Sequence, residues 1–496
     1  MDTWTQLTQR LTELDALSSA MSVLEWDQQC YLPPGGSDSR AGQSAVLGRI
    51  FHERFTDPAV GDWLAALAES DLDETKRAAV TQLRRKYVRA TVIPARLVED
   101  LAKARAEGFN TWLAAKASGD FAPYQAPLQR LIDLVREQAS LYAAGAAHPY
   151  DGLLEDYDPG STVAQLRPMF DRLAVALNTL LRAVDGRPHP GVDIPVLDGE
   201  GQRRLSDRVL TDLGFDLKRG RIDLAEHPFS INLGVGDVRL TTHVHPENFL
   251  STLGGTIHEC GHGMYEQGLP DHLAGTWLNR AAGMGMHESQ SRFWENFIGR
   301  SLPFCRYLVP RMQGIWPKLD LTPEQLFGSA NRVQRSLIRI FADEATYNLH
   351  IIVRFNLEVA VVEGKLEARD LPEAWNTMYR DVVGVAAPGD KEGVLQDVHW
   401  SSGLFGYFPS YTIGNLYAAS LGAKLVEEMP DIWRNVERGD FADILQWLRA
   451  RVHTKGAIAD APVIFAQAVG DRDPVEDLVA HLWNRQGKLY GVTRPA

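Results

Sequence analysis

Two histidines four residues apart carry the clearest chemical signal in the sequence. His258 and His262 lie in GGTIHECGHGMYEQG, and a glutamate follows the first of them. In a helix, residues with this spacing lie about 40° apart around the axis and one turn apart along it. Their imidazole nitrogens can then reach one zinc ion at roughly 2.0–2.1 Å. The spacing therefore predicts a zinc site on one face of a helix.

Glu259 is turned by about 100° from His258, so it is poorly placed as a ligand but can reach a water on the same metal. Zinc lowers the pKa of such a water, and a carboxylate beside it can take the proton and pass it on. We interpret Glu259 as a general base. The alternative is a coincidental His-Glu-His pattern on a solvated helix. Glycines such as Gly261 weigh against that alternative, because glycine inside a helix usually marks the close approach of another backbone or a ligand.

A catalytic zinc ion needs a third protein ligand and an open fourth position. The next helical pattern, AAGMGMHESQSRFWENF, offers His287, Glu288 and Glu295. It follows closely enough for the chain to turn and place a second helix beside the first. Glu288 is the preferred ligand, although the spacing does not exclude His287. Glu288, Arg292 and Glu295 also share one helical face, so an ion network is the alternative interpretation of these residues.

The elements that must position these residues are predicted to be mainly α-helical. Apolar residues recur at three- and four-residue spacing, most clearly over residues 73–91, 124–143, 163–183, 323–345 and 440–452. Residues 184–201 are rich in proline and glycine and break the pattern. They are predicted to link an N-terminal helical lobe (1–183) to a catalytic lobe (202–496) within a single unit that spans residues 1–496.

One region departs from the helical pattern just before the histidine motif. Residues 230–233 and 238–244 are β-prone and are separated by glycines, which predicts a small antiparallel hairpin next to the metal helix. A free strand edge there could bind an extended peptide as an additional strand. A hairpin that only caps the helix is the alternative, and position alone does not decide between them.

Two short motifs are weak signals when each is taken alone. DVRLT places Asp237, Arg239 and Thr241 on one face of a strand. IRIFAD is predicted to put Arg339 and Asp343 one turn apart on a helix. Such pairs are more often salt bridges than catalytic parts.

A third motif, GVLQDVHW, contains Gln396 and His399 and is followed by a glycine-rich stretch with Tyr407 and Tyr411. A packed tryptophan or a loop is the common explanation for such a segment.

Taken together, the motifs resemble the carboxypeptidase Taq family of metallocarboxypeptidases. The family pattern is HPF, DxRxT, HExxH, HES followed by GQ or SQ, I(R/A)xxAD and GxxQDxHW. It is found here, in order, at residues 227–229, 237–241, 258–262, 287–290, 338–343 and 393–400. Residues 26–58 and 153–166 are also similar to the family, with Cys30 where relatives commonly have threonine. The likeness therefore covers nearly the whole chain.

The resemblance implies a large helical zinc-peptidase fold with a deep cleft, similar to the saddle of neurolysin, and usually a homodimer. It implies His258, His262 and Glu288 as ligands of zinc, for which cobalt can substitute, and Glu259 as general base. Members of the family remove single residues from peptide C-termini with broad preference.

The remaining roles follow from the chemistry that such a reaction requires. An oxyanion formed at the scissile carbonyl needs hydrogen-bond donors. His399 and Tyr411 match the His and Tyr pair of similar peptidases, and Tyr407 is a second candidate.

An exopeptidase must also recognise a free carboxylate, which a guanidinium binds with two parallel hydrogen bonds. Arg339 is the first candidate for this role and Arg239 the second. Asp237 is expected to orient a neighbouring group, and Gln396 is assigned to substrate binding.

Charge and composition exclude several partner classes. The chain has 51 Lys and Arg against 64 Asp and Glu, a net charge of −13, so it has no general attraction for nucleic acid or anionic lipid. Three widely spaced cysteines and the absence of a signal-peptide pattern predict a cytoplasmic protein.

Two rival functions remain open. One is an endopeptidase or a dipeptidyl carboxypeptidase on the same scaffold. The other is an inactive peptide-binding protein that keeps its metal for structure. Glu259 argues against the second, because a purely structural site has no use for a carboxylate that is not a ligand.

Overall fold

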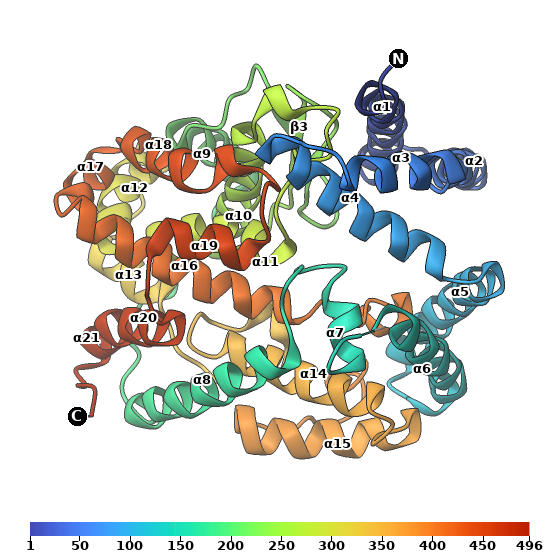
Figure 1. Cartoon of the computed structure of the whole chain (residues 1–496). Helices are drawn as coiled ribbons and strands as arrows, with labels where there is room; N and C mark the ends of the chain where they lie inside the picture. Colours follow the sequence, from blue (N-terminus) through green and yellow to red (C-terminus); the bar gives the residue numbers. More distant parts are fainter. Residues whose placement is uncertain (144, 496) are drawn as a thin grey trace. The chain divides into compact units, whose positions relative to one another are not determined.

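The computed structural model describes residues 1–143 and 145–495, which are mainly helical and include one small sheet (Figure 1). This confirms the predicted fold class. The chain forms two compact units, each assembled from three separate segments. Unit 1 comprises residues 1–90, 191–330 and 418–472, and unit 2 comprises 91–190, 331–417 and 473–496. The sequence-contiguous lobes, 1–183 and 202–496, are a different division of the chain and stay a prediction.

Unit 1 contains the sheet and the helices that precede and follow it. Its helices include α1 (Thr3–Cys30), α2 (Ser37–Phe55), α3 (Pro58–Ala68), most of α4 (Glu74–Val92), α9 (Gly199–Leu213), α10 (Phe249–Gly268), α11 (Met284–Arg292), α12 (Leu302–Ile315), α13 (Pro323–Ala330), α17 (Ile432–Arg438), α18 (Ala442–Arg451) and α19 (Ala461–Val469). Helix α16 (Pro409–Glu428) begins in unit 2 and ends in unit 1.

Unit 2 is built around α14, a helix that is buried over almost its whole length. Its helices include α5 (Ala95–Ser118), α6 (Ala122–Tyr142), α7 (Pro149–Leu154), α8 (Val163–Val184), α14 (Tyr347–Val362), α15 (Leu371–Met378), α20 (Pro474–Leu482) and α21 (Lys488–Tyr490). Within residues 1–143 and 145–495, the structure has no helix with the length and apolar character that a membrane crossing requires.

The sheet has three strands in the order β1-β3-β2, namely β1 (Gly220–Leu224), β3 (Val238–Thr242) and β2 (Ser230–Asn232). Strands β2 and β3 pair antiparallel with Ile231 opposite Arg239, which confirms the predicted hairpin. The parallel strand β1 was not predicted. The sheet packs closely on α10 at Gly263, where a Cβ atom would lie only 2.7 Å from a methyl carbon of Leu240.

Four of the five predicted helical segments are confirmed as α4, α6, α8 and α18. The fifth, 323–345, is wrong beyond Ala330, where α13 ends. Past this point, backbone N–H groups donate to distant side chains instead of continuing the helix. Val333 donates to the Tyr490 hydroxyl (2.9 Å) and Arg339 to Gln396 Oε1 (3.1 Å).

The predicted pairing of Arg339 and Asp343 on one helix is therefore also wrong. Arg339 begins a short 3₁₀ turn, Arg339–Phe341. Asp343 instead accepts hydrogen bonds from the backbone N–H groups of Ala345 and Thr346, just before α14 begins.

Candidate metal and catalytic site

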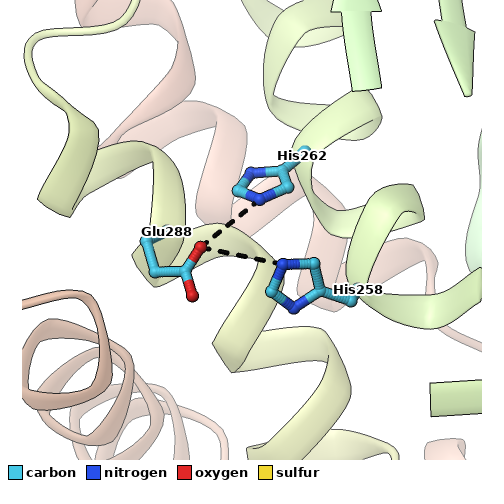
Figure 2. Close-up of side chains that lie close together, drawn as sticks. All are labelled: His258, His262 and Glu288. Carbon is cyan, nitrogen blue, oxygen red and sulfur yellow. Dashed lines mark ion pairs between the residues drawn. The ribbon is translucent and has the colours of Figure 1, made fainter. Parts of the chain in front are cut away.

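Two helices of unit 1 bring the predicted metal ligands together. His258 and His262 project from α10, and Glu288 projects toward them from α11 (Figure 2). Glu288 Oε2 lies 3.7 Å from His258 Nε2 and 3.4 Å from His262 Nε2. Helix α10 starts at a side-chain cap, in which Asn248 accepts from the Ser251 N–H, and this fixes the turn from which both histidines follow.

The spacing of these atoms fits a bound metal ion. Ligand atoms at 2.0–2.2 Å from a tetrahedral zinc ion are separated by about 3.4 Å. One ligand atom from each residue can be chosen so that all three lie within 4.8 Å of one another. Glu288 Oε1 accepts a hydrogen bond from Arg292 Nε (2.7 Å), which leaves Oε2 to face the histidines. Two nitrogens and one oxygen could supply three protein ligands, the number typical of catalytic zinc.

Helix α11 can approach α10 because Gly261 has no side chain. A Cβ atom at this position would lie 2.6 Å from the backbone oxygen of Gln290 and 2.7 Å from the Cα atom of Ser291. Both belong to α11, next to the third ligand. The glycine inside the motif therefore marks the close approach of another backbone, as expected from the sequence.

We predict that Gly261→Ala lowers the free energy of unfolding by about 1–3 kcal/mol, because the new methyl group must displace the α11 backbone. Thermal and urea unfolding measure this change. Gly254→Ala is the matched control on the same helix. There the added atom meets nothing closer than Glu295 Oε1 at 4.0 Å, so alanine should be neutral or stabilising. Equal effects of the two substitutions would contradict the close-packing argument.

The ion network that was the alternative interpretation of α11 exists alongside the ligand cluster. Arg292 bonds Glu288 and also Glu295 (3.1 Å). Glu295 lies on a π-helical turn, Phe293–Ile298, and its Oε2 is 2.9 Å from His258 Nδ1. Burial alone would lower the pKa of His258, but Glu288 and Glu295 outweigh it and raise the pKa. Glu288 therefore belongs both to this ion network and to the group of candidate metal ligands.

Glu259 differs from every other carboxylate around the site. It is 7% exposed, yet its side chain makes no hydrogen bond or ion pair with any residue that the structure describes. Burial raises its pKa to about 7, whereas the positively charged and hydrogen-bonding neighbours of Glu288 and Glu295 overcome burial and lower theirs. A carboxyl group with a pKa near neutrality is suited to accept and release a proton at physiological pH.

His287, which the spacing did not exclude as a ligand, uses both ring nitrogens for other contacts. Its Nδ1 lies 2.6 Å from His262 Nδ1 and its Nε2 lies 2.8 Å from Glu266 Oε1. Both ring nitrogens therefore have partners in unit 1.

Unit 2 gathers the residues of the IRIFAD and GVLQDVHW motifs. Asp397 Oδ1 accepts from Arg339 Nε (3.0 Å) and Nη2 (2.9 Å), and Asp397 Oδ2 accepts from Arg354 Nε (2.6 Å). Arg339 Nη1 donates to the Tyr347 hydroxyl. Gln396 contacts both arginines: its Oε1 accepts hydrogen bonds from the Arg339 backbone N–H and from Arg354 Nη2. Three of the five N–H donors of Arg339 are thus engaged.

His399, Tyr407 and Tyr411 also lie together in unit 2. His399 Nε2 is 3.3 Å from the Tyr411 hydroxyl, and the Tyr407 ring is 5.6 Å from the His399 ring. Burial lowers the pKa of His399 to about 3, so the ring is neutral near pH 7. Its Nδ1 is buried and has no partner among the described residues.

Asp237 and Arg239 pair with each other in unit 1. Arg239 donates to Asp237 from Nε (3.0 Å) and Nη2 (2.8 Å), and its guanidinium lies over the Trp26 ring at 4.1 Å. Thr241 of the same motif accepts from the Phe229 N–H.

A buried carboxylate in unit 2 was not anticipated. Glu358 on α14 is fully buried and accepts hydrogen bonds from the Tyr150 hydroxyl (2.6 Å), Trp400 Nε1 (2.8 Å) and the Gly406 N–H (3.0 Å). Trp400 directly follows His399 in the sequence, and Gly406 directly precedes Tyr407. Glu358 therefore fixes both ends of the segment that carries these side chains.

We predict a pH-dependent stability difference between the wild type and Glu358→Gln. Burial raises the pKa of Glu358 from 4.5 to about 7. A group whose pKa is higher in the folded state than in the unfolded state adds to the free energy of unfolding. This contribution is fully present below pH 4.5 and is lost as the pH rises through 7. When the pH is raised between these limits, the free energy of unfolding of the wild type should therefore fall by about 3 kcal/mol relative to that of the variant. Urea unfolding at pH 4.5 and pH 8 measures it, and a constant difference would contradict the assignment.

Sequence reasoning named Glu295 within the ion network of α11, but it missed Asp397, Arg354 and Glu358 as parts of the cluster in unit 2. The signal for the last two was present, because an arginine and a glutamate four residues apart interrupt the apolar run YNLHIIVRFNLEVAVV. Charged residues in a buried helix require partners. The partners themselves could not be identified, because they lie far away in the sequence.

Comparison with known proteins places this arrangement in context. The sequence profile of the carboxypeptidase Taq (M32) metallopeptidases matches residues 6–486. The chain is 41% identical over 491 residues to thermostable carboxypeptidase 1 of Thermus thermophilus, covering 96% of each chain. It is 36% identical over 487 residues to carboxypeptidase 1 of Bacillus subtilis, covering 97% of each. The crystal structure of an M32 carboxypeptidase from Deinococcus radiodurans superimposes with a TM-score of 0.96 at 36% identity, covering 99% of this chain and 100% of that one.

Proposed function

Because the chain belongs to the carboxypeptidase Taq (M32) family of metallocarboxypeptidases, which are peptide hydrolases, we propose the reaction that its residues carry out. The protein removes single residues from peptide C-termini with broad specificity, and Glu259 is the general base. The observation that carries this proposal is the buried carboxylate of Glu259, which has no partner among the described residues and a pKa raised to about 7, directly beside His258 in a cluster that could hold a metal ion.

His258, His262 and Glu288 are proposed to hold zinc, for which cobalt can substitute. The metal, when bound, supplies a Lewis acid and lowers the pKa of its water. Glu259 takes a proton from the attacking water and delivers it to the leaving amide nitrogen. A carboxyl pKa near neutrality suits both halves of this transfer, because the group must first bind the proton and then release it.

His399 and Tyr411 are proposed to donate hydrogen bonds to the oxyanion that forms when the peptide carbonyl is attacked. Two features support this role: the imidazole is neutral, and its Nε2 lies 3.3 Å from the Tyr411 hydroxyl. Tyr407, whose ring lies 5.3 Å from that of Tyr411, is the second candidate.

Arg339 is proposed to bind the terminal carboxylate of the substrate. Asp397 holds its guanidinium in place, Gln396 accepts a hydrogen bond from its backbone, and two of its N–H donors have no partner among the described residues and could bind a ligand. Arg239 is the second candidate, and Asp237 fixes its orientation through two hydrogen bonds. A guanidinium preorganised in this way loses little entropy when it binds a carboxylate.

Arg339→Ala should raise KM by about 10²-fold for a peptide with a free C-terminus, because a charge-assisted pair worth about 2–3 kcal/mol is lost. Steady-state kinetics measure this change. Arg239→Ala is the matched control and should have a smaller effect. Unchanged KM and kcat in the Arg339 variant would remove this residue from the role.

The proposed activity is tested with an N-blocked peptide whose C-terminus is either free or amidated. The zinc- or cobalt-loaded protein is incubated with each form, and the products are identified by mass spectrometry. A ladder of single-residue losses from the free form alone is the expected result. Internal cuts in both forms would identify an endopeptidase, and losses of two residues a dipeptidyl carboxypeptidase. No cleavage with metal bound would indicate a peptide-binding protein.

A cytoplasmic homodimer is proposed for the working enzyme. The dimer is supported by the family resemblance. The cytoplasmic location is supported by three free cysteines, two of them buried, since reduced thiols are typical of that compartment. Light scattering of the purified protein tests the dimer.

A further inference from the structure

The two histidines of the candidate metal cluster have different groups behind them. Both turn Nε2 toward Glu288. Behind His258, Nδ1 meets a carboxylate directly, namely Glu295 at 2.9 Å. Behind His262, Nδ1 meets another imidazole, that of His287, at 2.6 Å. The second arrangement requires one hydrogen between two ring nitrogens, and the surrounding atoms decide which ring carries it.

The hydrogen can be placed by following the chain of contacts outward. His287 Nε2 lies 2.8 Å from Glu266 Oε1, and Asn232 Nδ2 donates to Glu266 Oε2 at 2.7 Å. An ionised carboxylate can only accept, so His287 carries its hydrogen on Nε2. In the neutral ring, Nδ1 of His287 is then an acceptor. His262 must therefore donate from Nδ1, which leaves the lone pair of its Nε2 facing Glu288.

We propose that Asn232, Glu266 and His287 are positioning residues that fix the ring orientation and the tautomer of His262 for metal binding. The proposal rests on the metal site proposed above. Ligand histidines generally need such a partner to hold the correct nitrogen toward the metal. Here the partner is a second histidine, and the chain of hydrogen bonds ends on strand β2. The hairpin therefore supports the metal site through Asn232.

The contacts also explain why His287 belongs to the HES motif without being a ligand. The centroid of its ring is 4.4 Å from that of His262, with the rings tilted by 30°, and 5.5 Å from that of the Tyr265 ring. The side chain is held between α10 residues, and both ring nitrogens belong to the hydrogen-bond relay that runs from Asn232 through Glu266 and His287 to His262. A glutamine can reproduce the relay, since its carbonyl oxygen accepts and its amide donates.

The test is metal affinity in competition with a chromophoric chelator, together with the visible absorption spectrum of the cobalt-loaded protein. His287→Ala should weaken zinc binding by about 10–100-fold and alter the cobalt spectrum. His287→Gln should recover most of the affinity, and Asn232→Ala should have a smaller effect than His287→Ala. His453→Gln is the matched control. His453 is also a buried histidine next to the Tyr265 ring, but its Nε2 contacts Gln290 and not a proposed metal ligand. The His453 variant should therefore keep the wild-type zinc affinity and cobalt spectrum.

The outcomes separate this inference from the proposed function. If His262→Ala binds zinc as tightly as the wild type, the ligand assignment itself is wrong. If His262→Ala loses the metal while His287→Ala binds it with wild-type affinity and spectrum, the metal site stands and the relay is wrong. Failure of His287→Gln to exceed His287→Ala would also overturn the relay, because hydrogen bonding would then not be what His287 contributes.

Discussion

Glu259→Gln is expected to lower kcat by about 10²–10⁴-fold, the range that a positioned general base contributes. Glutamine has nearly the same shape, but its amide cannot accept the proton of the attacking water. The three proposed ligand side chains are unchanged, so the metal content should stay at the wild-type level. Steady-state kinetics on a peptide with a free C-terminus, together with metal analysis of the same sample, measure both quantities.

The pH profile gives a second readout for the same residue. Burial raises the pKa of Glu259 to about 7, and a bound cation would pull it down, because an opposite charge favours the ionised form. The ascending limb of kcat/KM should therefore lie at or below pH 7 in the wild type. It should be absent from the residual activity of the glutamine variant.

Cys260→Ala is the matched control, because this buried neighbour on α10 has no assigned role. Its kcat should stay close to the wild-type value. If Glu259→Gln kept kcat within a few-fold of the wild type with metal bound, the base would have to be another residue.

Asp397→Asn should lower the free energy of unfolding by about 3–5 kcal/mol, the usual effect of removing one partner from a buried ion pair. The carboxylate lies between Arg339 and Arg354, which are 7% and 0% exposed. Asparagine leaves two guanidinium groups without a counter-charge. Urea unfolding measures the loss. The same variant should raise KM, since Asp397 holds the proposed carboxylate anchor.

The arginines lower the pKa of Asp397 and overcome the opposing effect of burial. The ion pairs of Asp397 with the two arginines therefore stabilise the folded protein at pH values above about 4, the pKa of an aspartate in the unfolded chain. This stabilisation is lost only under more acidic conditions. The difference in the free energy of unfolding between the wild type and Asp397→Asn should shrink below that pH.

Asp133→Asn is the control in unit 2, because the Asp133 carboxylate is 60% exposed and pairs with Arg136 at the surface. This substitution should change the free energy of unfolding by less than about 1 kcal/mol. Equal losses in the two variants would contradict the buried-pair argument.

The parts of the site that sequence could predict are those governed by local periodicity. His258 and His262 fall on one helix face whatever the rest of the fold does, and the hairpin follows from β-prone runs around glycines. The next helical pattern offered three candidates for the third ligand, and the family resemblance favoured Glu288 among them. Gly261 was informative because a helix tolerates glycine poorly unless packing requires it.

The parts that could not be predicted depend on distant partners. The chain leaves helix α13 at Ala330 because Tyr490 and Gln396 accept hydrogen bonds from its backbone, and neither is near in sequence. For the same reason, the sequence could show that Arg354 interrupts an apolar helix but not that Asp397 neutralises it. The His262–His287 contact likewise required the two helices to be placed in space.

The assembly of unit 1 from three segments has a consequence for the order of events during synthesis. Its last segment, residues 418–472, contacts the chain on either side of Glu288: His453 Nε2 lies 3.0 Å from Gln290 Oε1, and the Ala457 N–H donates to the Leu278 carbonyl. Residues 258–288 leave the ribosome long before that segment exists. Because domains fold as units, we expect nascent chains to bind the proposed metal tightly only after residue 472 has emerged, which would place metal loading at the end of translation.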